Sequence, residues 1–283
     1  MIVCVRVGVV RWPLTHAVAH PPALSCLLYW VSGWVDSVLT DANAFVYLFT
    51  AKLPPSALVT NSRVIGGILT NTSADSADRL LALEMVARLP SEVMGNYAAA
   101  IVTQMSYNGD WHVRVQAVQT AVALPPHALA VAGGTAALLK ASNDRDADVA
   151  REAKAALGRL PLHSLDITSI DAIVASLLGG DVDAQVTLVG LLGRFASYEL
   201  ATPVPKLLRP HHVAAVAELV TARAKEQVSV AALHFFAAAD PELAVPHTQM
   251  LCQAMLHSQD NVQQAAREVL PRLPRRAVTE VCR

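Results

Sequence analysis

The stretch DWHVRVQAVQTAVALPPHAL, residues 110–129, decides the fold of this chain. It opens on Asp110, and aspartate caps helices because its carboxylate accepts hydrogen bonds from the free N–H groups of the first turn. Apolar residues then recur at helical spacing, at Val113, Ala117 and Ala121. Pro125 ends the helix, because proline lacks an N–H and restricts the residue before it. The stretch predicts one capped helix and the start of a second.

The same arrangement recurs along the chain, at 75–94, 146–165, 181–200 and 260–278, each time opening on Asp. An apolar residue follows each helix-ending signal, and successive residues of this series are 35 or 36 positions apart, except for 43 positions between the fifth and the sixth. The series is Leu58, Met94, Leu129, Leu165, Leu200, Leu243 and Val278. Hydrophobic residues make up 53% of the chain and charged residues 16%. A period of this size in so apolar a chain indicates stacked helical hairpins. We expect an all-α, right-handed α-solenoid of about seven hairpins.

The solenoid is expected to span residues 21–283, with residues 1–20 poorly defined and an irregularity around 201–212. The longer step is assigned to a loop that contains Pro203 and Pro205 and should bend the stack or project from it. Gly133-Gly134 is interpreted as an irregularity within a helix. The second helices of the hairpins are expected at Val93–Tyr107, His127–Ala141, Ser169–Leu178, His212–Ala224 and Pro246–His257.

The pattern resembles that of HEAT-repeat proteins, within the armadillo-like α-solenoids. Asp110, Val113-Arg114, Ala117 and Leu124 match the inner helix of that family most closely. The family's arginine is well placed only at Arg79 and Arg114, and Ala150, Gln185 and Gln263 stand there in other repeats. The resemblance implies a scaffold or adaptor whose inner helices line a concave face. It says nothing specific about the ligand.

Charge and composition exclude several classes. The net charge of −1 argues against a nucleic-acid binder. An apolar run from Trp12 to Val35 is similar to a signal peptide or anchor, but its prolines leave it short of a membrane span, so a membrane role is a minor alternative to a cytoplasmic protein. The four cysteines show no metal-site spacing and are expected to be free thiols in a reducing compartment.

The most distinctive candidate site is a row of basic residues before the helix-ending apolar positions. It holds Lys52, Arg88, Arg159, Arg194 and Arg272, with alanine at positions 123 and 237. One explanation is that each cation complements the macrodipole at the C-terminus of its own helix. The other is that the row also forms a basic ridge that binds an acidic peptide segment, with Arg79 and Arg114 as secondary candidates.

Catalytic and metal motifs are absent from the sequence. It has no phosphate-binding glycine loop, GxSxG elbow, HExxH or His-Glu dipeptide. His16 and His20 lie four apart without a third ligand, and His211-His212 is expected to be solvent-exposed at a helix start. We therefore expect no cofactor and no metal, and a non-catalytic protein-interaction scaffold that uses its concave face. The alternative is a repeat-based enzyme or enzyme subunit, similar to a bilin lyase.

Overall fold

A computed structural model describes residues 54–177, 179–220 and 224–281, and every regular element in these ranges is a helix. None of the helices described is long and apolar enough to cross a bilayer. The chain separates into two compact units, residues 1–90 and 91–283, which we treat separately. The predicted boundary at residue 20, the pair His16 and His20, and Lys52 lie outside the described residues.

The first unit contains α3 (Pro55–Thr60), α4 (Ser62–Thr70) and α5 (Ser76–Val86), and each helix packs on the next. The side chain of Asp75 accepts a hydrogen bond from the Asp78 amide at 2.8 Å and so caps α5, as the sequence predicts. Leu58 and Leu83 are fully buried. The unit has the order short helix, second helix, capped helix.

The second unit repeats that order several times. We call the helices that follow each outer helix, as α5 follows α4, the inner column: α8 (Trp111–Val122), α11 (Ala147–Gly158), α13 (Val182–Ala201), α15 (Glu226–Ala238) and α18 (Asp260–Val269). Of these, α15 begins after Lys225 and has no aspartate at its start. The outer column contains α7 (Ala98–Tyr107), α10 (Gly134–Ala141), α12 (Ile167–Leu177), α14 (Pro210–Ala217) and α17 (Thr248–Ala254). Short helical segments precede most outer helices, and a final helix ends the unit: α6 (Ser91–Met94), α9 (Pro126–Val131), α16 (Pro241–Ala244) and α19 (Arg275–Val281).

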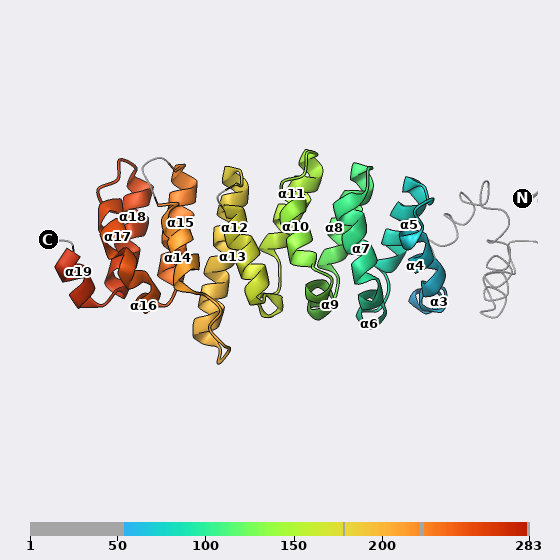
Figure 1. The fold of residues 1–283 in the computed structure, drawn as a ribbon, viewed down its shortest axis with the longest axis horizontal. Coiled ribbons are helices and arrows are strands. Elements are labelled where there is room, and N and C mark those ends of the chain that lie inside the picture. The colour runs from blue at the N-terminus through green and yellow to red at the C-terminus, as the bar shows by residue number, and fades with distance from the viewer. Residues whose placement is uncertain (1–53, 178, 221–223, 282–283) are drawn as a thin grey trace, which may run out of the picture. The chain divides into compact units, whose positions relative to one another are not determined.

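Neighbouring repeats pack helix against helix. Each inner helix contacts the next from α8 to α18, and outer helices do the same from α7 to α14 (Figure 1). Val113, Ala117 and Ala121 of α8 are fully buried, and small alanine side chains allow the close approach of neighbouring helices. The described chain is therefore the all-α solenoid expected from the 35-residue period.

Aspartate caps begin three inner helices of this unit as predicted. Asp110 accepts from the His112 amide, Asp146 from the amides of Asp148 and Val149, and Asp181 from the Ala184 amide. The prediction is wrong for Asp260, which is the first residue of α18. Gln259 holds the cap position there and makes no side-chain cap.

Three of the predicted second helices, Val93–Tyr107, His127–Ala141 and Pro246–His257, are divided into shorter segments. Ser169–Leu178 corresponds to the single helix α12, and His212–Ala224 corresponds to α14, which ends earlier than predicted, at Ala217. Between α9 and α10, Gly133 has a φ of 71°, a left-handed conformation that favours glycine. A Cβ on Gly134 would lie 2.9 Å from the Leu129 carbonyl oxygen, so the chain also turns too closely for a side chain there. The irregularity read from Gly133-Gly134 is thus confirmed and separates two helices.

The extra residues of the long step between Leu200 and Leu243 belong mainly to a longer inner helix, and not to the proline loop to which they were assigned from the sequence. α13 runs to Ala201 because Phe195-Ala196 stands where other repeats have Leu-Pro, so nothing stops the helix. Leu200, one of the periodic apolar residues, is consequently 51% exposed. The extended end of α13 projects beyond its neighbours in Figure 1.

The segment after α13 is fixed by a buried carboxylate. Glu199, 8% exposed, accepts hydrogen bonds from the amides of Leu207 and Leu208. Lys206 forms an ion pair with Asp240, which holds the pKa of that carboxyl below its usual range although burial raises it. The irregularity predicted at 201–212 is therefore an anchored loop over 202–209.

One cysteine departs from expectation. Cys252, in α17, is disulfide-bonded, so the prediction of a free thiol is wrong at this residue.

Candidate functional site

The fourth residue of α5 and of almost every inner-column helix forms hydrogen bonds that connect the helix to the segment before it. Arg114 Nη1 donates to the Asn108 carbonyl at 2.9 Å and to that of Gly109 at 3.3 Å. The equivalent donors elsewhere reach carbonyls of their own preceding segments: Arg79 to Asn71 and Thr72, Gln185 to Leu177, Ser229 to Leu219 and Gln263 to His257. Glutamine or serine therefore takes the place of arginine in this contact, and Ala150 of α11 is the exception among these helices.

Arg114 has a further structural partner. Its Nε and Nη2 both lie 2.8 Å from the Asp144 carboxylate, and the residue is 5% exposed. Burial raises the pKa of Asp144, but the hydrogen bonds from Arg114 and the Asp146 amide outweigh this and hold it below the usual range. Arg114 thus links α8 to the loop before α11. We place Arg79, which contacts the segment before its own helix, and Arg114, which also reaches the next repeat through Asp144, among the packing contacts.

The basic ridge is arranged differently from the prediction. Arg194 lies in the middle of α13, so it cannot complement the C-terminus of its own helix. Its Nη1 instead donates to the Gly158 carbonyl, the last residue of α11, and its Nη2 lies 3.5 Å from the Leu160 carbonyl. Arg272 donates likewise to the Ala237 carbonyl near the end of α15. Each of these arginines caps the preceding inner helix. For Arg194 this contact corrects the macrodipole explanation, whereas Arg272 lies just beyond the C-terminal end of its own helix α18, where that explanation stays a prediction.

Arg159 stands beside this cap. It is the C-cap residue of α11, is solvent-exposed, and its guanidinium forms no hydrogen bond or ion pair with any residue that the structure describes. Since Arg194 contacts the carbonyls on both sides of residue 159, two cations lie at the end of α11. Arg88 is also exposed, two residues beyond α5 in the first unit.

A groove of about 320 Å³ lies between the last two inner helices. Glu226, Val230 and His234 of α15 form one wall, and Gln264 and Glu268 of α18 form part of the other. Its two carboxylates make the groove unfavourable to an acidic ligand.

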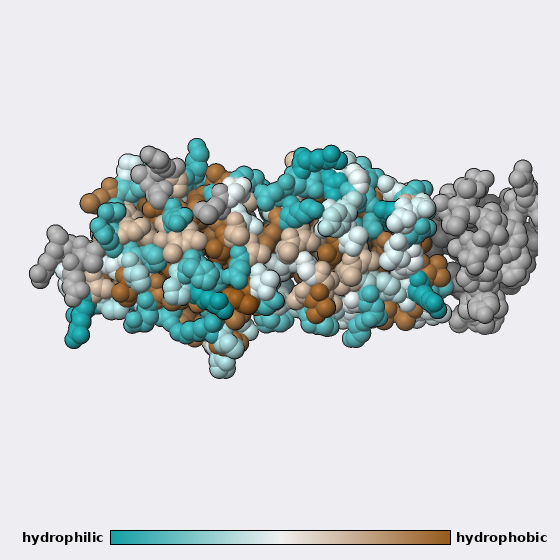
Figure 2. Space-filling view, in the orientation of Figure 1, coloured by the Kyte–Doolittle hydropathy of each residue, from teal (hydrophilic) through white to brown (hydrophobic). Residues whose placement is uncertain are grey.

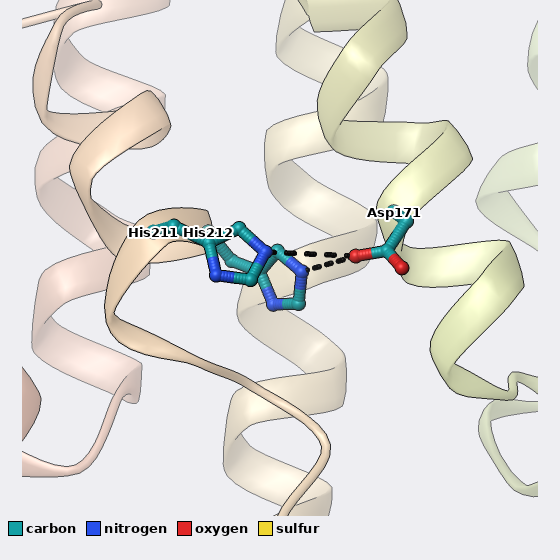
Figure 3. A group of neighbouring side chains, drawn as sticks. All are labelled: Asp171, His211 and His212. Atoms are coloured by element: carbon teal, nitrogen blue, oxygen red, sulfur yellow. Dashed lines mark hydrogen bonds and ion pairs between the residues drawn. The ribbon is translucent and has the colours of Figure 1, made fainter.

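A further cluster joins two outer helices. His212 and His211 of α14 both direct Nε2 towards one carboxylate oxygen, Oδ1 of Asp171 in α12, at 2.7 and 3.6 Å (Figure 3). His212 is 1% exposed, so the expectation that both histidines are solvent-exposed is wrong for this residue. Its Nδ1 accepts a hydrogen bond from the Arg209 amide at 3.1 Å. The hydrogen bond from His212 holds the pKa of Asp171 below its usual range.

Sequence reasoning missed this cluster because Asp171 and His212 are 41 positions apart and belong to different repeats. Pro210 at the first turn of α14 was the available signal, since a proline there places the next two residues inside a helix.

Solved structures match the fold of this chain, whereas the comparisons of sequence find no match. No family model matches the chain, and no curated protein matches it. A computationally designed armadillo repeat protein for modular peptide recognition aligns with a TM-score of 0.51 at 17% identity, covering 75% of this chain and 99% of that one. A designed armadillo repeat protein in complex with the peptide (KR)4 aligns with a TM-score of 0.47 at 18% identity, covering 76% and 98%. The chain has the fold of an armadillo- or HEAT-like helical repeat protein.

Proposed function

We propose that this chain is a non-catalytic scaffold that binds an extended acidic segment of a partner protein on its inner column. The observation that carries the proposal is the pair Arg159 and Arg194 at the C-terminal end of α11. Arg159 has no acidic partner among the described residues, so a bound carboxylate would meet a charge that the fold does not neutralise.

The surroundings favour this location over the rest of the column. Gly158 is exposed, and a Cβ added there would meet nothing within 4 Å, so a ligand backbone could approach the helix end closely. The groove between α15 and α18 carries Glu226 and Glu268 and would repel the same ligand. We therefore expect the footprint to centre on the C-terminal end of α11 and the part of α13 around Arg194.

The character of the surface and the fold agree with a binding role. On the face shown in Figure 2, hydrophobic and hydrophilic residues are interspersed, so this face offers both apolar and polar contacts to a partner. The designed armadillo protein of similar fold is described as made for modular peptide recognition, which supports a peptide-like partner for this chain too.

The test measures fluorescence anisotropy of a labelled peptide rich in Glu and Ser, with a Lys- and Ser-rich peptide for comparison. We expect the acidic peptide to bind, and Arg159→Glu to weaken binding about tenfold or more by replacing attraction with repulsion. Arg276→Glu, an exposed arginine of α19 with the same charge change, is the matched control and should leave affinity nearly unchanged. Failure of the acidic peptide to bind, or equal effects of the two substitutions, would refute the proposal.

The lyase-like alternative gives a separate result. A chain that acts on a chromophore should co-purify with one or bind it saturably, which an absorbance scan and titration detect. Saturable chromophore binding would replace the scaffold proposal.

A further inference from the structure

Asp171, His211 and His212 bring three metal-ligand side chains together from two neighbouring outer helices. One donor atom from each lies within 4.8 Å of the others, and Figure 3 shows both imidazoles facing the same carboxylate. α12 and α14 pack against each other, so the arrangement does not depend on a loop alone. His212 is buried and held in place, while Asp171 and His211 are exposed and open to solvent.

We propose that this cluster binds one divalent transition-metal ion of the Zn²⁺ type. Two imidazole nitrogens and one carboxylate oxygen suit Zn²⁺, Ni²⁺ or Co²⁺, whereas Ca²⁺ and Mg²⁺ prefer oxygen donors alone. Ligand bonds of about 2.0–2.2 Å place donor atoms of a tetrahedral site roughly 3.3–3.6 Å apart.

The observed spacings are close to that requirement. The distance of 3.6 Å from His211 Nε2 to Asp171 Oδ1 fits directly. The distance of 2.7 Å from His212 Nε2 must widen, and rotation of the exposed Asp171 side chain would allow it. Three protein ligands leave at least one position for water.

Metal binding has a defined structural consequence in this site. Because His212 Nδ1 accepts from the Arg209 amide, the proton of the neutral ring lies on Nε2, the atom that the metal would use. When the metal takes Nε2, the remaining proton must move to Nδ1, and the Arg209 amide then loses its acceptor. A metal-bound histidine normally donates its other N–H, so the bound state and the N-terminal cap of α14 exclude each other.

This exclusion couples the ion to the loop over 202–209, which ends at Arg209. The lost hydrogen bond and the positive end of the α14 dipole both weaken binding. We therefore expect a reversible site that alters the loop, and the inference does not depend on the proposed partner.

The experiment titrates the metal-stripped full chain with Co²⁺, followed by visible absorption, and then displaces it with Zn²⁺. We expect one equivalent of metal to bind saturably, and Asp171→Asn and His211→Ala each to lower the affinity at least tenfold. Both positions are exposed, and circular dichroism verifies that the two variants fold. His127→Ala is the control, because His127 is exposed in α9 and lies outside the cluster. Absence of saturable binding, or binding that survives both substitutions, would overturn the site.

Hydrogen exchange tests the coupling separately. The Arg209 amide should exchange faster with Zn²⁺ bound than without it. Unchanged or increased protection at that amide would contradict the exclusion between the metal and the cap.

Discussion

Replacing Arg114 by alanine should be among the most destabilising single changes in the inner column. The guanidinium makes two contacts of 2.8 Å with Asp144 and one of 2.9 Å with the Asn108 carbonyl, with its side chain 6% exposed. Removing one partner of a buried ion pair costs about 3–5 kcal/mol, because the other charge is left desolvated and unpaired. Asp144 keeps the Asp146 amide as a donor at 2.9 Å and its side chain is 15% exposed, so we expect about 3 kcal/mol.

Arg151→Ala provides the matched control for this prediction. Arg151 pairs with Asp148 within α11, but the two side chains are 69% and 45% exposed. Such a pair contributes about 0.5 kcal/mol or less. Urea unfolding followed by far-UV circular dichroism compares the two variants. Equal losses of unfolding free energy would show that Arg114 does not link the repeats as described.

Three further changes test other parts of the fold. Gly134→Ala should destabilise the chain by about 1–3 kcal/mol, because the added Cβ would meet the Leu129 backbone oxygen. Gly109→Ala is the control and should cost little, since nothing lies within 4 Å of its Cβ. Thermal unfolding of the two variants checks this prediction. Glu199→Ala should leave two amides without an acceptor and make the 202–209 loop cleavable by protease, at a cost of about 2–3 kcal/mol, and unchanged cleavage would count against the anchor. Asp144→Asn should lower the unfolding free energy at neutral pH but leave it equal to that of the unsubstituted chain in strong acid. The pKa of Asp144 is lower in the folded chain than its ordinary value of 3.8, so its carboxylate contributes stability above 3.8 and loses that contribution as the pH falls through the folded pKa. Acid titration of unfolding free energies for both proteins measures the difference.

Local signals in the sequence were sufficient for the architecture. Aspartate caps and Leu-Pro stops act within a few residues, so the helix order and the repeat could be predicted from spacing alone. The same logic explains the main error: where Phe195-Ala196 replaces Leu-Pro, the missing stop should have been taken as a longer helix, and Leu200 should have been expected on its exposed end.

The contacts between repeats could not be predicted from the sequence. Arg194 was assigned to the end of its own helix, whereas its donors reach α11, about one repeat earlier in the chain. His212 was expected in solvent because its partner Asp171 lies on another outer helix. Periodicity predicts which residues occupy equivalent positions, but the neighbour that each side chain meets depends on how the repeats stack.

Hydrogen exchange of the chain with and without the acidic peptide tests the central claim most directly. Binding at the C-terminal end of α11 and the middle of α13 predicts slower exchange of the amides around 158–160 and 190–197, with α10, α12 and α14 of the outer column unchanged. Protection confined to the outer helices, or to the groove between α15 and α18, would contradict the account.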